Sequence, residues 1–281
     1  MNRPLIRFFV WLGLTAVFTT AGVGIWMLVF QGSQTTASLK WLQFLQTVAT
    51  FLLPAIVGAW LWADNHKPFV WLRMNRGMEW KVALLAVTAM VCAIPGINLL
   101  ADLNSRVQLP ESLGFIEQIL RQQEEAAAAL TERFLQADNI GMLLVNIGLL
   151  ALLPALAEET AFRGTLQQIA GNTHAAVWIT AFLFSAVHMQ FYGFVPRMLM
   201  GAMLGYIFVW TGSLWVPILM HATNNGLAVL CYYLLGADQN SKTWADTIGT
   251  GAMWWLGIIS IVATGAVLYM LYRRTQDSPH V

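Results

Sequence analysis

The chain has 281 residues, of which 58% are hydrophobic and 10% are charged, and its formal net charge is +1. Soluble domains usually carry about 25% charged residues, so the composition excludes an ordinary soluble protein and indicates a protein embedded in lipid. The low net charge argues against nucleic acid or another polyanionic partner. Cys92 and Cys231 both lie in apolar runs, which excludes a disulfide framework and a CxxC metal site.

Eight segments are apolar enough to predict membrane helices, each of which needs about 20 residues. Five of them contain no Asp, Glu, Lys or Arg: Phe8–Phe30, Trp41–Ala63, Val82–Leu100, Leu214–Leu235 and Met253–Tyr272. Polar groups interrupt the other three: Ile140–Ala170, Ala175–Gln190 and Val195–Trp210. The first segment is too long for the apolar part of a cleavable signal peptide, and we expect it to be retained. We predict an all-α polytopic membrane protein with about eight transmembrane helices, in the inner or plasma membrane.

Lys and Arg residues near the helix ends predict the orientation in the membrane. They form three groups: Arg3 and Arg7; Lys67, Arg73, Arg76 and Lys81; Arg273 and Arg274. With eight spans, all three groups fall on one side of the membrane. That side is therefore predicted to be cytoplasmic, and both termini with it.

The loop over residues 102–138 falls on the opposite side and carries seven acidic against three basic residues. Pro110 can open a helix there. Apolar side chains then recur at helical spacing, at Ile116, Leu120, Ala127, Leu130 and Phe134. The loop is expected to hold one amphipathic extramembrane helix, either resting on the outer membrane surface or capping an intramembrane cavity.

No linker or repeat divides the chain into separate folding units. We expect one membrane domain with three parts. Residues 1–139 hold the first three transmembrane helices and the acidic loop, residues 140–236 form a helical core, and residues 237–281 hold a loop, the last transmembrane helix and the tail.

Ionisable residues at membrane depth are costly and usually functional. Here they are confined to one stretch of the chain, at Glu158, Glu159, Arg163, His188, Arg197 and His221. Because most spans carry none, this concentration predicts a single intramembrane site. Arg197 lies near the outer end of its helix, where we expect it to reach the membrane surface as an anchor.

The fourth and fifth predicted helices form a hairpin that brings two of these residues together. Glu158 lies 14 residues before the turn at Asn172 and His188 lies 16 residues after it. These separations are about 21 and 24 Å along antiparallel helices, so the side chains reach similar depths, in the cytoplasmic half of the bilayer. Glu159 and Arg163 share a helix face and can neutralise each other, which leaves Glu158 without a partner in its own helix.

Two further features bear on the backbone around the site. Pro154 lies one helical turn before Glu158, where a proline kinks the helix and is expected to open space. Gly201 and Gly205 form a GxxxG pattern, which predicts close helix packing within the chain.

The ionisable residues belong to three motifs in a fixed order. They are EExxxR from Glu158 to Arg163, FxxxH from Phe184 to His188, and HxxxN from His221 to Asn225. In this order, roughly from Ile140 to Leu235, they resemble the CPBP family of intramembrane endopeptidases, which includes CAAX proteases and bacteriocin-processing, ABI-type proteins.

The resemblance implies a role for each motif residue. Glu158 would activate the hydrolytic water and His188 would position or polarise it. His221 and Asn225 would stabilise the oxyanion. Glu159, Arg163 and Phe184 match the positions that support the site.

Peptide hydrolysis requires a base for water and donors for the developing oxyanion, and these residue types provide both. We favour metal-independent glutamate catalysis without a cofactor, because the sequence has no HExxH motif and Glu159 has a near partner in Arg163. The alternative is a zinc site with Glu158, His188 and His221 as ligands.

We therefore predict an intramembrane protease that hydrolyses a peptide bond in a membrane-associated protein or peptide, with a prenylated CAAX-type protein as one candidate substrate. Two alternatives remain. The same charge cluster can serve a proton-coupled transporter as a relay, although no inverted repeat is evident. A non-catalytic immunity or sorting protein can also be built on the same fold. The expected partners are the lipid bilayer and that substrate.

Overall fold

The computed structural model describes residues 4–236 and 243–277, which contain helices and no strand. Seven helices are long and apolar enough to cross a membrane. They span Pro4–Phe30, Thr36–Trp62, Trp80–Ser105, Ile140–Gln167, Phe191–Thr211, Trp215–Leu235 and Gly251–Asp277. The chain is therefore an all-α, multi-pass membrane protein.

These seven helices correspond to seven of the eight predicted spans, and the prediction for Ala175–Gln190 is wrong. In its place α9 covers His174–Ala186, only 13 residues. At 1.5 Å per residue it is about 20 Å long, too short for a hydrocarbon core of about 30 Å. Met189, a non-glycine residue, has a φ of 55° in the turn that follows. His188 therefore lies in a turn beyond the helix end.

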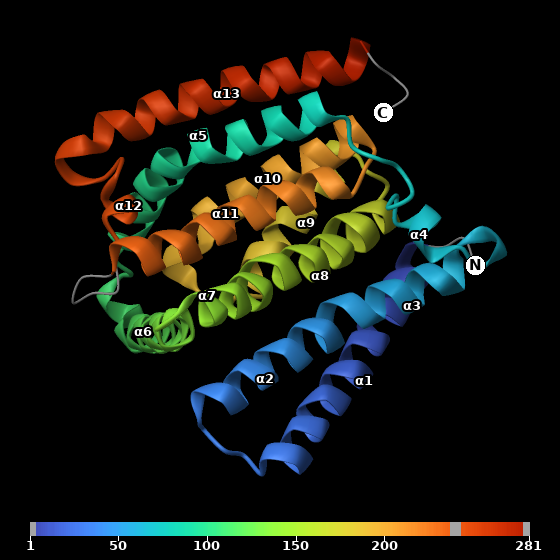
Figure 1. Ribbon diagram of the computed structural model, residues 1–281, viewed down its shortest axis with the longest axis horizontal. Helices are drawn as coiled ribbons and strands as arrows, with labels where there is room; N and C mark the ends of the chain where they lie inside the picture. The colour runs from blue at the N-terminus through green and yellow to red at the C-terminus, as the bar shows by residue number, and fades with distance from the viewer. Residues whose placement is uncertain (1–3, 237–242, 278–281) are drawn as a thin grey trace.

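The two ends of the described chain lie at the same end of the bundle (Figure 1). Although α9 is short, it runs back from the end of α8, and α10 returns beside it. With α9 counted, the chain makes an even number of antiparallel helical passes, as the predicted orientation requires. Which side of the membrane is cytoplasmic stays a prediction, and Arg3, one of the residues used for it, lies outside the described residues.

Several helices consist of consecutive pieces. The N-terminal pair is α1 (Pro4–Phe30) and the continuous run of α2 (Thr36–Thr47), the π-helical turn η1 (Val48–Leu52) and α3 (Leu53–Trp62). The short α4 (Pro68–Trp71) and then α5 (Trp80–Ser105), α6 (Gly114–Leu135) and α7 (Ile140–Asn146) follow. The fourth long helix continues from α7 through π turn η4 (Ile147–Leu152), α8 (Leu153–Ala161) and π turn η5 (Phe162–Gln167). After α9 come the 3-10 turn η6 (Phe191–Gly193), α10 (Phe194–Thr211), α11 (Trp215–Leu235), α12 (Trp244–Thr247) and α13 (Trp254–Asp277).

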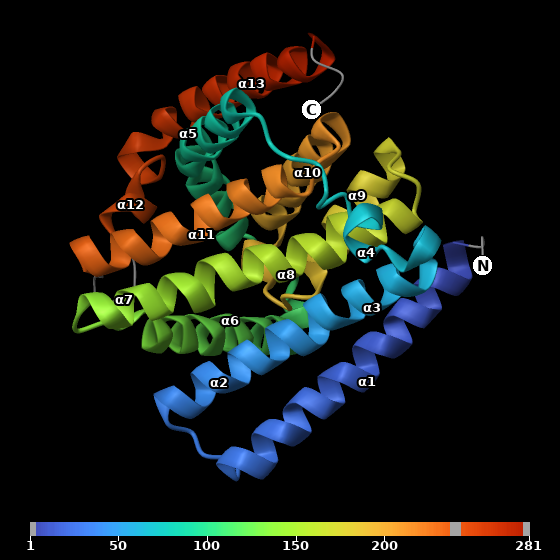
Figure 2. The same cartoon turned by 45° about the vertical axis from the view of Figure 1, so that its right-hand side comes forward.

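The helices lie in a consistent order across the bundle. In Figures 1 and 2, α13 covers α5, the helix of α7 and α8 lies between α11 and the α2–α3 helix, and α1 lies on the outside. α8 packs against both α11 and η1. The helix that carries Glu158 and Glu159 is therefore central in the bundle.

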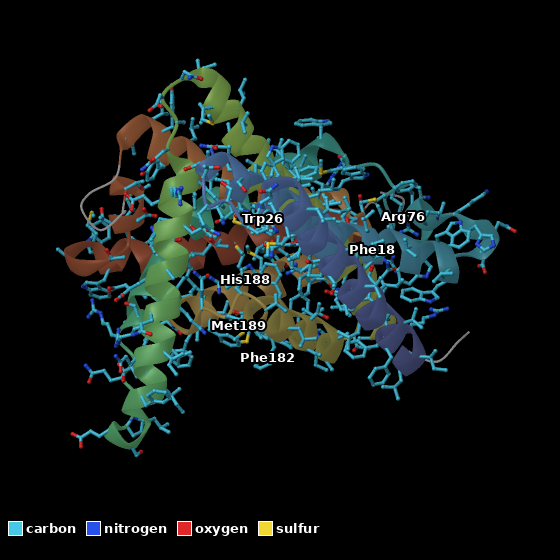
Figure 3. All side chains as sticks on the ribbon, turned by 90° about the horizontal axis from the view of Figure 1, so that it is seen from below. Phe18, Trp26, Arg76, Phe182, His188 and Met189 are labelled. Carbon is cyan, nitrogen blue, oxygen red and sulfur yellow. The ribbon has the colours of Figure 1, made fainter. Side chains whose placement is uncertain are left out.

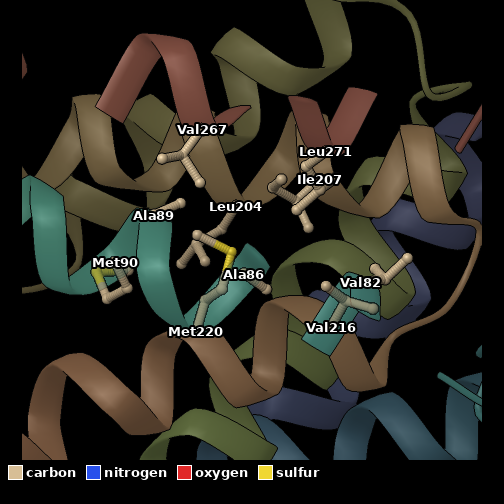
Figure 4. Packing of buried hydrophobic residues seen from close by; sticks show 10 residues of the cluster. All are labelled: Val82, Ala86, Ala89, Met90, Leu204, Ile207, Val216, Met220, Val267 and Leu271. Atoms are coloured by element: carbon tan, nitrogen blue, oxygen red, sulfur yellow. The ribbon is translucent and has the colours of Figure 1, made fainter. Parts of the chain in front are cut away.

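A buried apolar cluster joins α5, α10, α11 and α13 (Figure 4). Its members are Val82, Ala86, Ala89, Met90, Leu204, Ile207, Val216, Met220, Val267 and Leu271. Hydrogen bonds of Ser260 in α13 lie beside this cluster. The Ser260 hydroxyl donates to the Cys92 carbonyl of α5, and it accepts a hydrogen bond of 2.9 Å from the Gly96 N–H of the same helix. These bonds fix α13 against α5.

The GxxxG pattern packs within the chain, as predicted. A Cβ at Gly201 would lie 3.2 Å from the Phe184 ring, and one at Gly205 would lie 2.9 Å from Val177. Both contacts are with α9. Two side chains of η5 donate hydrogen bonds to these glycines: Arg163 Nη2 to the Gly201 carbonyl at 2.8 Å, and Gln167 Nε2 to the Gly205 carbonyl at 3.1 Å. The glycines therefore let α10 approach both α9 and the helix that carries the motif residues.

The acidic loop does contain a helix, α6, which starts four residues after Pro110. It is seen nearly end-on in Figure 1 and along its length in Figure 3, so it crosses the direction of the spanning helices. Arg133 ties its C-terminal half to the start of α2 through Thr36 Oγ1, at 2.9 Å, and the Gln34 carbonyl, at 2.6 Å. Phe115 near its other end is 77% exposed. Only part of the apolar surface of α6 is therefore covered by protein.

Candidate active site

The two adjacent glutamates of α8 belong to different clusters. Glu159 Oε1 accepts hydrogen bonds from Arg163 Nη1 and from His221 Nδ1, each at 2.8 Å. These three side chains are almost completely buried, with exposed fractions of 0%, 1% and 3% for Glu159, Arg163 and His221. We call them the ionic brace, because they join α8, η5 and α11.

An aromatic ring separates the ionic brace from the second cluster. Phe184 of α9 is 1% exposed, and the Arg163 guanidinium lies 4.6 Å from the centre of its ring. The same ring makes edge contacts with His221 and His188, at centroid distances of 5.9 and 5.2 Å. Phe184 therefore fixes the spacing of the two histidines, which gives the FxxxH phenylalanine a packing role.

The second cluster is the pair Glu158 and His188. Glu158 Oε2 lies 4.0 Å from His188 Nε2, beyond direct hydrogen-bonding distance, and the side chains are 13% and 28% exposed. His188 Nδ1 donates to the Phe184 carbonyl at 2.7 Å, so in the neutral ring Nε2 carries the lone pair. Figure 3 labels His188 and Met189 in the turn that ends α9. This pair, unlike the brace, is partly exposed.

The backbone around α8 departs from regular α-helix on both sides. The π turns η4 and η5 flank it, and such turns frequently occur at functional sites. Pro154 has no N–H to donate to the carbonyl of Leu150 one turn earlier. Asn225 Nδ2 makes a long hydrogen bond, 3.4 Å, to that carbonyl. Asn225 is thus placed one turn from His221 on α11, and its amide contacts the proline-interrupted helix.

Arg197 differs from its expected role as a surface anchor. Its Nη2 donates to Gln190 Oε1 at 2.6 Å, while Nη1 is buried and has no hydrogen-bond partner among the described residues. Gln190 follows His188 by two residues, so this hydrogen bond joins Arg197 to the segment after α9. The side chain therefore bonds to the segment that follows His188, and the sequence offered no signal for this beyond the presence of a charge at membrane depth.

The turn that follows His188 is held by α6. The Tyr192 N–H donates to Glu124 Oε2 at 3.3 Å, and the Arg121 guanidinium lies 4.5 Å from the centre of the Tyr192 ring. Arg121 also donates to Glu117, with Nη2 and Oε1 2.6 Å apart, and this hydrogen bond holds the pKa of the Glu117 carboxyl below its usual range. The acidic helix therefore contacts the segment next to the candidate site.

The ligand set proposed for zinc does not come together. The described residues contain no group of three or more His, Cys, Asp or Glu side chains that could hold a metal ion. Glu158 and His188 face each other, but His221 directs Nδ1 to Glu159 and not to this pair. The arrangement of these side chains does not fit a three-ligand zinc site.

Comparisons with known proteins agree with the motifs. Residues 140–227, less than half of the chain, match the family model described as Type II CAAX prenyl endopeptidase Rce1-like. An uncharacterized protein of Bacillus subtilis (strain 168), YpbD, is 36% identical over 80 residues, which cover 27% of this chain and 40% of that protein. The match thus spans well under half of the relative's length. No solved structure matches.

Proposed function

We propose that this chain is an intramembrane endopeptidase whose base is Glu158, because residues 140–227 match the family model described as Type II CAAX prenyl endopeptidase Rce1-like. Similarity to that family suggests an intramembrane protease. The observation that carries the assignment of the base is the contrast between the two glutamates. Glu159 is fully buried and paired with Arg163, while Glu158 is partly exposed and faces His188 at 4.0 Å.

The chemistry follows from where the free lone pairs lie. A water between Glu158 and His188 donates one proton to the Glu158 carboxylate, and its oxygen attacks the carbonyl carbon of the scissile bond. His188 Nε2 accepts the water's other hydrogen and orients it, because Nδ1 is bonded to the Phe184 carbonyl. When the C–N bond breaks, the proton held by Glu158 passes to the leaving nitrogen. The products are a carboxylic acid and an amine.

The negative charge that develops on the carbonyl oxygen requires hydrogen-bond donors. Asn225 offers an amide on α11, one turn from His221, and its present hydrogen bond to Leu150 is long enough to be exchanged. His221 uses Nδ1 to bond Glu159, so it donates to the oxyanion only with a second proton on Nε2. Glu159 and Arg163 then act by holding His221 in place.

We propose a membrane-associated peptide or protein as substrate, and a prenylated CAAX-type protein within that class because the matched family is described as CAAX prenyl endopeptidases. The multi-pass fold supports a substrate that is itself bound to lipid.

The test uses the purified full chain in detergent with a prenylated CAAX peptide and an unprenylated membrane peptide. Cleavage of at least the first is expected from the wild type, and none from Glu158→Gln at unchanged folding. Glu125→Gln, which removes an exposed carboxylate on α6, is the matched control and is expected to cleave normally. Cleavage by Glu158→Gln at the wild-type rate would remove this residue from its assigned role.

A further inference from the structure

A groove lies between α2 and the helical run of α7 and η4, and neither Glu158 nor His188 lines it. Its volume is about 580 Å³. Both walls belong to membrane spans, and side chains on each wall are about half exposed: Trp41 is 54% exposed and Val145 is 53% exposed. The open side of the groove therefore faces the lipid, where a hydrocarbon chain can enter.

The groove has the length and the lining that an acyl chain needs. Its α2 wall runs from Thr36 to Phe44, which is about 12 Å along the helix at 1.5 Å per residue. That length is close to one leaflet, or half of a hydrocarbon core of about 30 Å. Beyond Lys40 the lining is apolar and includes Trp41, Phe44, Val145 and Leu149.

Lys40 places a positive charge at one end of the groove. Its Nζ donates to Asn146 Oδ1 at 2.6 Å, and Met142 Sδ, a weak acceptor, lies 3.5 Å away. Asn146 is completely buried, and its Nδ2 donates to the Leu135 carbonyl at 3.0 Å, so its oxygen is fixed toward the lysine. No ion pair within residues 4–236 and 243–277 includes Lys40. A neutral amide therefore holds the ammonium in the groove and leaves it donor capacity for an anion.

A second cation, Arg133 of α6, lies at the same end. Its Nε donates to Thr36 Oγ1 at 2.9 Å and its Nη2 to the Gln34 carbonyl at 2.6 Å, and both partners are neutral. Thr36 lines the groove one helical turn before Lys40, so the two cations are close together. The ion pairs in the described part of the chain omit Arg133 as well. Two cations without a carboxylate partner beside an apolar groove match a molecule with an anionic head and a hydrocarbon tail.

We infer that this groove binds an anionic phospholipid, with the headgroup phosphate at Lys40 and Arg133 and one acyl chain along Trp41 and Phe44. Inorganic phosphate would leave the apolar groove empty, and a zwitterionic lipid would bring a cation of its own close to these two. Arginine and lysine both bind phosphate, through charge-assisted hydrogen bonds. The inference does not depend on the proposed peptidase activity.

The lipid also has a structural consequence. It would lie between α2 and α7, and α7 belongs to the helix that continues into α8. A ligand that binds only the folded state stabilises it. The phospholipid is therefore expected to hold α2 against the helix that carries Glu158 and to raise the midpoint of thermal unfolding.

The experiment measures lipid binding to the delipidated full chain in detergent by native mass spectrometry, with phosphatidylglycerol and phosphatidylcholine of identical acyl chains. Bound lipid is counted per folded molecule. The wild type is expected to bind phosphatidylglycerol on the order of 10-fold more tightly, since the two cations favour net negative charge. Equal affinity for the two lipids would mean that the groove holds bulk lipid without recognition and would overturn the inference.

Lys40→Gln and Arg133→Gln are each expected to weaken phosphatidylglycerol binding on the order of 10-fold, because a charge-assisted hydrogen bond is lost. Lys40→Arg and Arg133→Lys keep the charges and are expected to keep the preference for the anionic lipid. If one glutamine variant does not fold, the other decides. The matched control is Lys67→Gln, an exposed lysine beyond the other end of the α2–α3 helix, and it is expected to bind as the wild type. Unweakened binding by a folded glutamine variant contradicts the assigned headgroup position.

A second pair of variants tests the acyl chain. Val145→Trp fills the groove from a side chain that is already half exposed, and it is expected to weaken binding of both lipids. Val262→Trp is the control, because Val262 of α13 is 69% exposed and does not line this groove. Phosphatidylglycerol with brominated acyl chains is expected to quench less fluorescence in Trp41→Phe than in the wild type. Wild-type binding by Val145→Trp would mean that surface charge alone attracts the headgroup, and the groove assignment would fail.

Competition distinguishes the other occupants. Neither inorganic phosphate nor a prenylated peptide is expected to displace phosphatidylglycerol. Displacement by phosphate would make the ligand a soluble anion, and displacement by the peptide would assign the groove to a substrate. A dimer that forms without lipid and is lost in Val145→Trp would assign it to a second copy of the chain. Each of these three results would overturn the inference.

Discussion

Neutralising Glu159 is expected to destabilise the protein far more than neutralising its neighbour Glu158. Glu159→Gln leaves Arg163, which is 1% exposed, without a counter-charge, and weakens the hydrogen bond to His221. Removing one partner of a buried ion pair costs about 3–5 kcal/mol, and the retained amide oxygen places this change near the lower end. Glu158→Gln changes a side chain that is 13% exposed and makes no direct ion pair, so its expected cost is below about 1 kcal/mol.

Thermal unfolding in detergent, followed by tryptophan fluorescence, measures the difference. At about 2–4 °C per kcal/mol, Glu159→Gln is expected to lower the midpoint by about 6–12 °C and Glu158→Gln by less than about 4 °C. The double variant Glu159→Gln, Arg163→Met is expected to recover part of the loss, because it leaves no unpaired buried charge. Equal midpoints for the two glutamine variants, or a double variant less stable than Glu159→Gln alone, would refute the division into brace and site.

Three further outcomes follow from local contacts. Gly205→Ala is expected to lower the free energy of unfolding by about 1–3 kcal/mol, since its Cβ would lie 2.8 Å from Gln167 Oε1. Gly13→Ala, whose Cβ would have no such atom within 4 Å, is the control and is expected to be neutral or slightly stabilising in the same unfolding assay. The lowered pKa of Glu117 means that its contact with Arg121 stabilises α6 above about pH 4, and that this stabilisation is lost as pH falls through the folded-state pKa. Amide protection factors over residues 106–120, which correct for the intrinsic pH dependence of hydrogen exchange, should therefore fall on acidification in the wild type but not in Glu117→Gln. Peptide cleavage is expected to survive a chelator, and loss of activity that zinc restores would contradict metal-independent catalysis.

Most of the membrane architecture could be predicted because it depends on length and polarity alone. Seven spans correspond to apolar runs of about 20 residues, and α6 follows from periodicity after Pro110. The end of α9 could not be predicted in this way. It depends on a left-handed backbone at Met189, a residue type that carries no signal for such a conformation, and on the Ser185 hydroxyl, which donates to the Phe194 carbonyl at 2.7 Å.

Within the candidate site, local spacing was informative and long-range packing was not. The hydrogen bond between Glu159 and Arg163 follows from a separation of four residues in one helical run. The bond between Glu159 and His221 joins residues 62 positions apart and depends on how α11 packs on α8. The direction of Arg197 depends on the space that Gly193 leaves. Sequence spacing therefore predicted the contact between Glu159 and Arg163 and the approach of Glu158 to His188, but not the pairing of Glu159 with His221.

Helix geometry explains why two adjacent glutamates, Glu158 and Glu159, can have different roles. Consecutive helical residues point about 100° apart, so Glu158 and Glu159 cannot face the same neighbours. Glu159 faces Arg163 and His221, where its charge is used to hold two other helical segments. Glu158 faces the turn with His188, where its charge has no direct partner. A single glutamate at either position would supply only one of these arrangements. With Glu159 alone, the carboxylate would be bonded to Arg163 and would be a poor base. With Glu158 alone, the buried Arg163 would have no counter-charge. The adjacent pair thus allows α8 to be both fixed in the bundle and reactive.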